Sequence, residues 1–207
     1  MASTESSVPF SGDRSMDLES LKALAHPLRV KIVDVLSTYG PFTASGLAER
    51  LGESSGATSY HLRQLEKHNF VREVEGRGTA RERWWERVPG ALSLDRAELR
   101  ESPAGKAASQ LVMNEWSNSR EKNLRDFIDR GEDTLSREWY DASTISLANV
   151  MVTAEQLKTI SAALEKIIDE TVGEFRGQKI AGARPVQLQI ATFPVVDGKE
   201  IPPEDPS

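Results

Sequence analysis

Residues 53–71 read ESSGATSYHLRQLEKHNFV, and this stretch decides the fold of the N-terminal half of the chain. Its first serines can cap a helix by accepting hydrogen bonds from backbone N–H groups that have no partner within the helix. An apolar stripe then follows the expected helix, formed by Tyr60, Leu62, Leu65 and Phe70 or Val71. We therefore expect a helix that packs along one side and presents short or forked polar side chains on the other.

A second helix is expected immediately before this one. Thr43 is a good N-cap, the apolar residues of 47–51 share one face, and Gly52 is placed to end the helix. Further upstream, residues 18–36 form a helical stripe interrupted by His26-Pro27. Proline breaks a helix interior but suits a first turn, so this is either one kinked helix or a short helix followed by another from Pro27. Helix, glycine turn and helix predict a helix-turn-helix.

Two strands should follow and form a β-hairpin wing. Residues 70–75 alternate apolar and polar, residues 76–79 have turn chemistry, and residues 81–88 resume a strand-like run. The adjacent Trp84 and Trp85 must point to opposite faces of their strand. We expect one of them in the core and the other over the linker or a second domain.

These elements together resemble a known family. The fragments that carry the resemblance are Leu24-Ala25-His26-Pro27-Leu28-Arg29, Leu47-Ala48, Ser59-Tyr60-His61-Leu62-x-x-Leu65, and the hairpin after Phe70-Val71. In this order and spacing they resemble the winged helix-turn-helix of ArsR-type bacterial transcription regulators, over roughly residues 18–90. The resemblance implies a homodimeric regulator of double-stranded DNA, expected to be a repressor.

The polar face of the helix after Ser54 is the predicted reader of DNA. Small hydroxyls suit phosphate or sugar, and a forked side chain such as Arg63 or Gln64 suits base edges in the major groove. The full predicted set is Ser55, Thr58, Ser59, His61, Arg63, Gln64, Arg77, Thr79 and Arg81. His61 has the alternative of a capping or core histidine. Arg77, between two glycines, is expected at the wing tip and in the minor groove, with a solvated turn arginine as the alternative.

The distribution of charge along the chain favours DNA binding by residues 18–94. Residues 18–94 hold 11 basic and 9 acidic side chains, a net charge of +2, whereas the whole chain carries −6. Neutralising phosphates with Lys and Arg dominates DNA affinity, so the acidity is best placed outside the reader. A rival function for an acidic chain is a protein-interaction adaptor that uses a winged helix without binding DNA.

The C-terminal half is expected to form a helix-rich domain with a small two-stranded sheet. Residues 104–130 predict a long helix, and the Thr153 to Gln156 spacing predicts a capping box before a second one. Alternation in residues 145–152 and 186–193 predicts two strands, parallel or antiparallel, joined by that helix as a β-α-β unit. This region can dimerise through the long helix, bind a small organic effector between Trp116, Phe127 and Trp139, or dock another protein.

Several functions are disfavoured by what the sequence lacks. There is no cysteine, and no histidine follows His68, so neither metal-sensing pattern of ArsR-type repressors can be assembled. We find no nucleophile elbow and no glycine-rich phosphate loop, and therefore expect no enzyme, no cofactor and no metal. No signal peptide or transmembrane segment is evident, which predicts a cytoplasmic protein with no membrane partner.

The expected architecture is α+β. We divide it into a flexible tail at 1–16, a winged helix-turn-helix DNA-binding domain at 17–94, a dimerisation and effector domain at 95–193, and a disordered tail at 194–207.

Overall fold

A computed structural model describes residues 14–79, 82–90, 92–93, 97–175, 178 and 180–202 of the chain. The chain divides into two compact units. The N-terminal unit comprises the described parts of Met1–Ser143 with Arg184–Gln187, and the C-terminal unit those of Thr144–Ala183 with Leu188–Ser207. The boundary predicted after residue 94 therefore falls inside the N-terminal unit.

The N-terminal unit begins with a short strand and two helices. β1 is Arg14–Ser15, α1 is Leu18–Leu24 and α2 is Pro27–Tyr39. Of the two arrangements considered for His26-Pro27, the structure has the break: Pro27 opens α2, and His26 caps it by accepting from the Leu28 N–H at 3.2 Å. The tail predicted at 1–16 is wrong at its end, because Met16 is fully buried and β1 pairs with Leu92 and Ser93.

The helix-turn-helix follows as predicted. β2 is Phe42–Thr43, α3 is Ala44–Leu51 and α4 is Ser55–Lys67. Thr43 caps α3 by accepting from the Gly46 N–H at 3.0 Å, and Gly52 ends it with φ of +68°, a left-handed backbone that glycine adopts without strain. Ser54 then caps α4 by accepting from the Ala57 N–H at 3.1 Å.

The wing is a three-stranded antiparallel sheet in the order β2-β4-β3, where β3 is Val71–Thr79 and β4 is Glu82–Arg87. The predicted turn at residues 76–79 is wrong, because β3 continues through them and Gly78 pairs with Arg83. The two glycines serve instead a register shift between Glu73 and Gly78, where both take positive φ.

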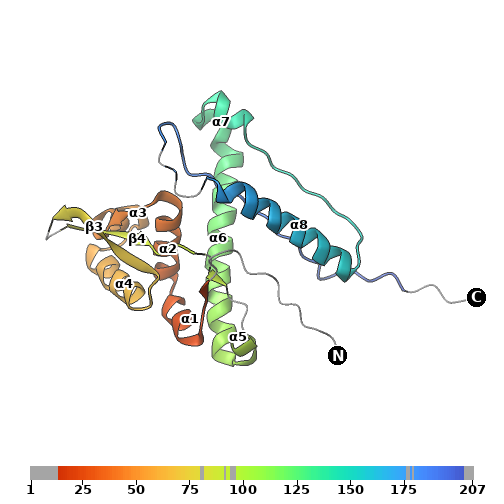
Figure 1. The fold of residues 1–207 in the computed structure, drawn as a ribbon, viewed down its shortest axis with the longest axis horizontal. Coiled ribbons are helices and arrows are strands. Elements are labelled where there is room, and N and C mark those ends of the chain that lie inside the picture. The colour runs from red at the N-terminus through yellow and green to blue at the C-terminus, as the bar shows by residue number, and fades with distance from the viewer. Residues whose placement is uncertain are drawn as a thin grey trace, which may run out of the picture. The chain divides into compact units, whose positions relative to one another are not determined.

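A long helix packs on the helix-turn-helix. β5 is Leu92–Ser93, α5 is Ala97–Glu101, α6 is Pro103–Thr134 and α7 is Arg137–Asp141. Figure 1 shows α6 lying alongside α1 and α2. Ala108 and Val112 of α6 enter the same core as Leu62, Leu65 and Trp85, so the first half of α6 belongs to the DNA-binding fold rather than to a separate domain.

The C-terminal unit contains α8, Ala154–Gly173, which follows an extended segment at residues 144–153 (Figure 1). The predicted capping box is confirmed: Thr153 accepts from the Gln156 N–H and Gln156 accepts from the Thr153 N–H. The strands predicted at 145–152 and 186–193 are wrong for the single chain, since neither segment carries a strand. Alternation reports a surface that fits a sheet, but a strand also needs a hydrogen-bonded neighbour.

Candidate nucleic-acid interface

Burial separates α4 into an inner and an outer face. Thr58, His61, Leu62 and Leu65 are the buried residues of the helix. They recur at three- and four-residue spacing, which is the spacing of one helical face. The predicted stripe correctly contained Leu62 and Leu65 but is wrong for Tyr60, which is 53% exposed because a residue two positions before Leu62 points to nearly the opposite side.

Thr58 is a structural residue in this fold. Its side chain has no exposed surface, and its hydroxyl donates to the carbonyl of Ala44 at 2.9 Å, with the Ser54 and Ser55 carbonyls also in reach. The contact joins α4 to the first residue of α3. The prediction that Thr58 meets phosphate is therefore corrected: its hydroxyl faces the α3–α4 contact.

His61 is a core histidine, the alternative weighed for it above. It is 8% exposed, its ring lies 4.4 Å from that of His26, and its Nδ1 accepts from Nε of Arg29 at 3.2 Å. Arg29 also donates to the Ala23 carbonyl. Burial, followed by the charges of His26 and Arg29, lowers the pKa of His61, so its neutral ring is favoured. This cluster fixes α4 against the α1–α2 turn.

The remaining predicted residues of α4 face outward. Ser55 and Arg63 are exposed, and Ser59 and Gln64 are half-buried. Within the described parts of the chain, the side chains of Arg63 and Gln64 make no hydrogen bond and no ion pair. Their donors are therefore available to an external partner, and the four residues span the first three turns of the helix, where a DNA-reading helix makes its contacts.

Two more residues share this outer face and were missed from the sequence. Tyr60 was assigned to the apolar stripe, and Lys67 lies one turn beyond Arg63 and is exposed. Lys67 lies four residues after Arg63, and Tyr60 lies four residues before Gln64, so helical spacing alone could have found both residues.

The wing presents its arginines differently from the prediction. The guanidinium carbon of Arg77 lies 3.6 Å from the ring centroid of Trp84, a cation–π contact that holds the side chain against β4. Trp84 thus covers Arg77 rather than the linker, while Trp85 is the tryptophan in the core, with 4% exposure. Thr79 ends β3, and Arg81 lies outside the described residues.

Ion pairs neutralise two other arginines of the hairpin. Arg72 pairs with Glu86 across the strands at 2.7 Å, and Arg83 pairs with Glu73 at 3.5 Å. Acidic side chains of the same hairpin therefore compete with phosphate for these groups. Arg77, by contrast, has no carboxylate partner among the described residues.

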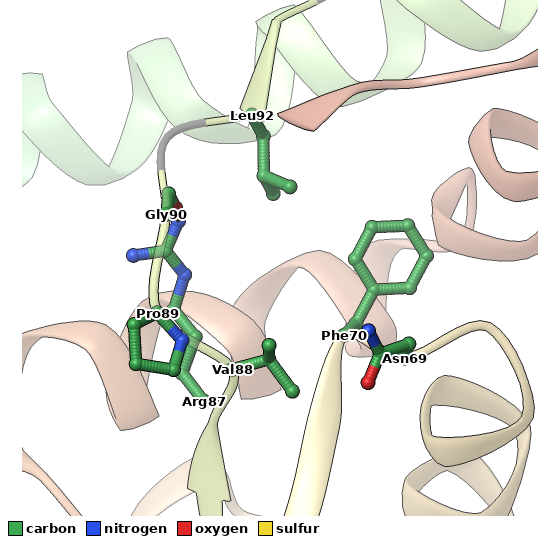
Figure 2. A pocket seen from close by; sticks show the side chains of 7 residues that line it. All are labelled: Asn69, Phe70, Arg87, Val88, Pro89, Gly90 and Leu92. Carbon is green, nitrogen blue, oxygen red and sulfur yellow. Dashed lines mark hydrogen bonds between the residues drawn. The ribbon is translucent and has the colours of Figure 1, made fainter. Parts of the chain in front are cut away.

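A small hollow lies beyond the end of α4. Figure 2 shows its lining, which is Asn69 and Phe70 on one side and Arg87, Val88, Pro89, Gly90 and Leu92 on the other. Its volume of about 10 Å³ is enough for about one water molecule. A second, open hollow of about 400 Å³ lies on α5 and α6, lined by Leu99, Arg100, Lys106, Ser109, Gln110 and Met113.

The aromatic pocket predicted for an effector is not formed at either hollow. Trp116 packs against the core, and Phe127 stacks on Tyr140 with 5.8 Å between the ring centroids. Within the described ranges, no three His, Asp or Glu side chains gather as metal ligands, and no helix is long and apolar enough to span a bilayer.

Comparison with known proteins places a helix-turn-helix here. Residues 24–74 match a family model described as a helix-turn-helix domain, which covers α2 to the first half of β3. No curated protein matches the sequence. The match spans less than half of the chain, so it assigns this segment to a class and leaves the rest of the chain unassigned.

Several solved structures share local likeness. HlyU from Vibrio cholerae N16961 is 28% identical over 33% of this chain and 71% of its own, with a TM-score of 0.29. A possible transcriptional regulator for arsenical resistance is 26% identical over 62% of this chain and 100% of its own, with a TM-score of 0.30. MarR from E. coli is 13% identical over 72% and 89%, with a TM-score of 0.28.

At such TM-scores these likenesses carry no argument about this chain, and the assignment rests on the family match and the geometry above. The N-terminal unit is a helix-turn-helix domain with a β-hairpin wing, within an α+β fold, and such domains serve DNA-binding transcription regulation.

Proposed function

We propose that this protein is a sequence-specific transcription regulator of ArsR type, expected to be a repressor, that binds double-stranded DNA as a homodimer in the cytoplasm. The observation that carries the proposal is the outer face of α4, where Arg63 and Gln64 lie without partners in the described chain beside the small hydroxyls of Ser55 and Ser59. A helix that exposes such polar side chains on one face fits the width of the DNA major groove.

Each group has a role that its geometry supports. The N-terminal Ser55 and Ser59 would bind phosphate or sugar, and Arg63 or Gln64 would read base edges. Arg77, held on Trp84, would bring one charge to the DNA beside α4. Thr79 and Arg81 remain predictions for the wing. Thr58 and His61 are buried and are not proposed as DNA contacts. Their hydrogen bonds instead position α4 against α3 and α2.

A homodimer is supported by information content, because one reading helix contacts too few base pairs for useful specificity. A two-fold dimer reads two half-sites about one helical turn apart, roughly 34 Å centre to centre. The effector, if an organic molecule serves as one, has the open hollow on α5 and α6 as its candidate site. Among the described residues no group of metal ligands argues for a metal sensor.

The proposal is tested by selecting random duplexes on the purified protein. A pseudopalindrome with half-sites about one turn apart is expected. With that operator, Arg63→Ala should weaken binding about 5- to 150-fold, which corresponds to the roughly 1–3 kcal/mol of a bidentate arginine contact. Arg72→Ala is the matched control, since Arg72 is already paired with Glu86 on the wing. Equal affinities of both variants and wild type would contradict the proposal.

The paired wing arginines favour one rival, a protein-interaction adaptor, because they lower the charge available to phosphate. Salt separates the two functions. A regulator should lose duplex affinity steeply as salt rises, whereas an adaptor should bind no duplex even in dilute buffer.

A further inference from the structure

The C-terminal unit has no core of its own. Among the described residues of Thr144–Ala183 and Leu188–Ser207, none is buried. Its helix α8 nevertheless has a sound local structure, with a complete capping box and a stripe formed by Leu157, Ile160, Leu164, Ile167 and Ile168. A helix with such a stripe is stable only when the stripe packs against another apolar surface.

The extended segment before α8 has the same deficit. Residues 145–152 contain neither proline, glycine nor charge, and Leu147, Met151 and Val150 are 87%, 73% and 66% exposed. No backbone hydrogen bond joins this segment to another described residue. An unpaired, uncharged, apolar segment of this length is a template for strand addition, and natural proteins cover such edges.

The segment after α8 covers only part of the helix. Ser161 of α8 and Thr192 share a hydrogen bond of 2.6 Å, which holds the chain near residue 192 against α8. The side chains of Leu188, Ile190 and Phe193 are still 58%, 47% and 70% exposed. The unit therefore has the elements of an α/β layer whose apolar surfaces remain open.

The distribution of exposed apolar side chains over the two units indicates which partner covers the C-terminal unit. Among its described residues, the N-terminal unit has few exposed large apolar side chains; they are scattered over α2, α4, α6, α7 and residue 186 and form no matching apolar face. Of the exposed large apolar side chains among the described residues, fifteen belong to the C-terminal unit and six to the N-terminal unit, and such a concentration marks an interaction surface. The apolar surface that matches the C-terminal unit is therefore the same unit of a second copy of the chain.

We propose that the C-terminal units of two copies form one shared core, in which residues 145–152 become a strand by pairing with the same segment of the second copy. Two identical strands that pair antiparallel are related by a two-fold axis, as an isologous dimer requires. The proposal deepens the homodimer of the proposed function and rests on it. It places the dimer contact on this segment and α8, rather than on α6.

Sedimentation equilibrium of full-length variants tests the shared core. Leu147→Glu changes a side chain that is 87% exposed in the single chain, so the monomer should fold, while the shared core would have to bury two carboxylates. The dimer dissociation constant should rise at least about 100-fold. Ile128→Glu is the matched control, since Ile128 is 62% exposed on α6 and should leave the dimer intact. A dimeric Leu147→Glu variant, or a dimer broken by Ile128→Glu alone, would overturn the shared core.

Cross-linking gives an independent readout because the chain has no cysteine. Asn149→Cys, near the centre of the segment, should form a disulfide between copies under a mild oxidant, and Ser117→Cys, at an exposed position of α6, should not. A cross-link at Ser117→Cys with none at Asn149→Cys would again place the contact on α6 and overturn the inference.

Duplex binding of the wild type separates this inference from the proposed function. A dimer that meets these tests yet binds no duplex refutes the regulator and leaves the shared core standing. A wild type that binds a palindromic duplex but sediments as a monomer when free refutes the shared core and leaves the regulator standing.

Discussion

Replacing Thr58 by valine tests whether its hydroxyl builds the fold or contacts DNA. Valine keeps the shape of the buried side chain but removes the hydrogen bond to the Ala44 carbonyl at 2.9 Å. The acceptors are not left unsatisfied: the Ser54 carbonyl still accepts from the Thr58 N–H at 3.0 Å, and the Ala44 and Ser55 carbonyls lie at helix starts, where they accept intrahelical N–H groups. The loss is therefore about 0.5–1.5 kcal/mol, the net worth of one hydrogen bond, rather than the larger penalty of an orphaned buried group.

Chemical denaturation and a duplex titration should both be made on Thr58→Val, with Thr58→Ser as the control that retains the hydroxyl. We expect Thr58→Val to lower the denaturation midpoint with an unchanged slope, and to bind duplex with wild-type affinity under conditions where it is fully folded. The reasoning is refuted if stability is unchanged while affinity falls, because that result belongs to a phosphate contact.

Two further predictions follow from the same unit. Burial, with the charges of His26 and Arg29, lowers the pKa of His61 below its ordinary 6.5, so the unfolded chain binds the proton more readily. The contribution of His61 to the free energy of unfolding should be fully present above about pH 6.5 and should be lost as the pH drops from there toward the folded pKa. Urea titrations at several pH values check this, and His61→Gln should flatten the profile in that range. In the wing, Gly78 has φ of +97° and a Cβ there would overlap the backbone of the facing strand, so Gly78→Ala should expose the hairpin amides to hydrogen exchange at a cost of about 1–3 kcal/mol. Gly76→Ala, with φ of +70° but open space around its Cβ, should cost less; equal exchange in both variants would contradict the close approach.

Local chemistry made much of the N-terminal fold predictable. Thr43, Gly52 and Thr153 were found from their spacing because capping satisfies backbone groups within three or four residues of the cap, and such contacts are written in consecutive sequence. The helix-turn-helix, the hairpin and the long helix were predicted for the same reason. The tip of the wing was not, because the choice between a turn and a shifted register depends on how β3 pairs with β4.

The candidate site was predictable only as a helix, and its two faces were not. Thr58, Tyr60 and His61 are all side chains that suit either a core or a surface, and their assignment depended on where α2 and α3 lie against α4. The Thr58 hydroxyl donates to the Ala44 carbonyl of α3, and His61 accepts from Arg29 of α2. In both contacts the partner lies on another element of the chain. Sequence spacing carries no record of such contacts until the chain is folded.

The sequence by itself determined the order of the helix-turn-helix and the hairpin, the caps at Thr43, Ser54 and Thr153, and the strand-like pattern of residues 145–152 and 186–193. Only the tertiary structure decided which polar residues of α4 face outward, that α6 shares the core of the winged fold, and that the alternating segments carry no strand in the described part of the chain. The physical reason is the distance along the sequence between the residues that interact. Caps and periodicity are settled by neighbours a few residues away, whereas burial and strand pairing are settled by whichever surface the folded chain brings alongside.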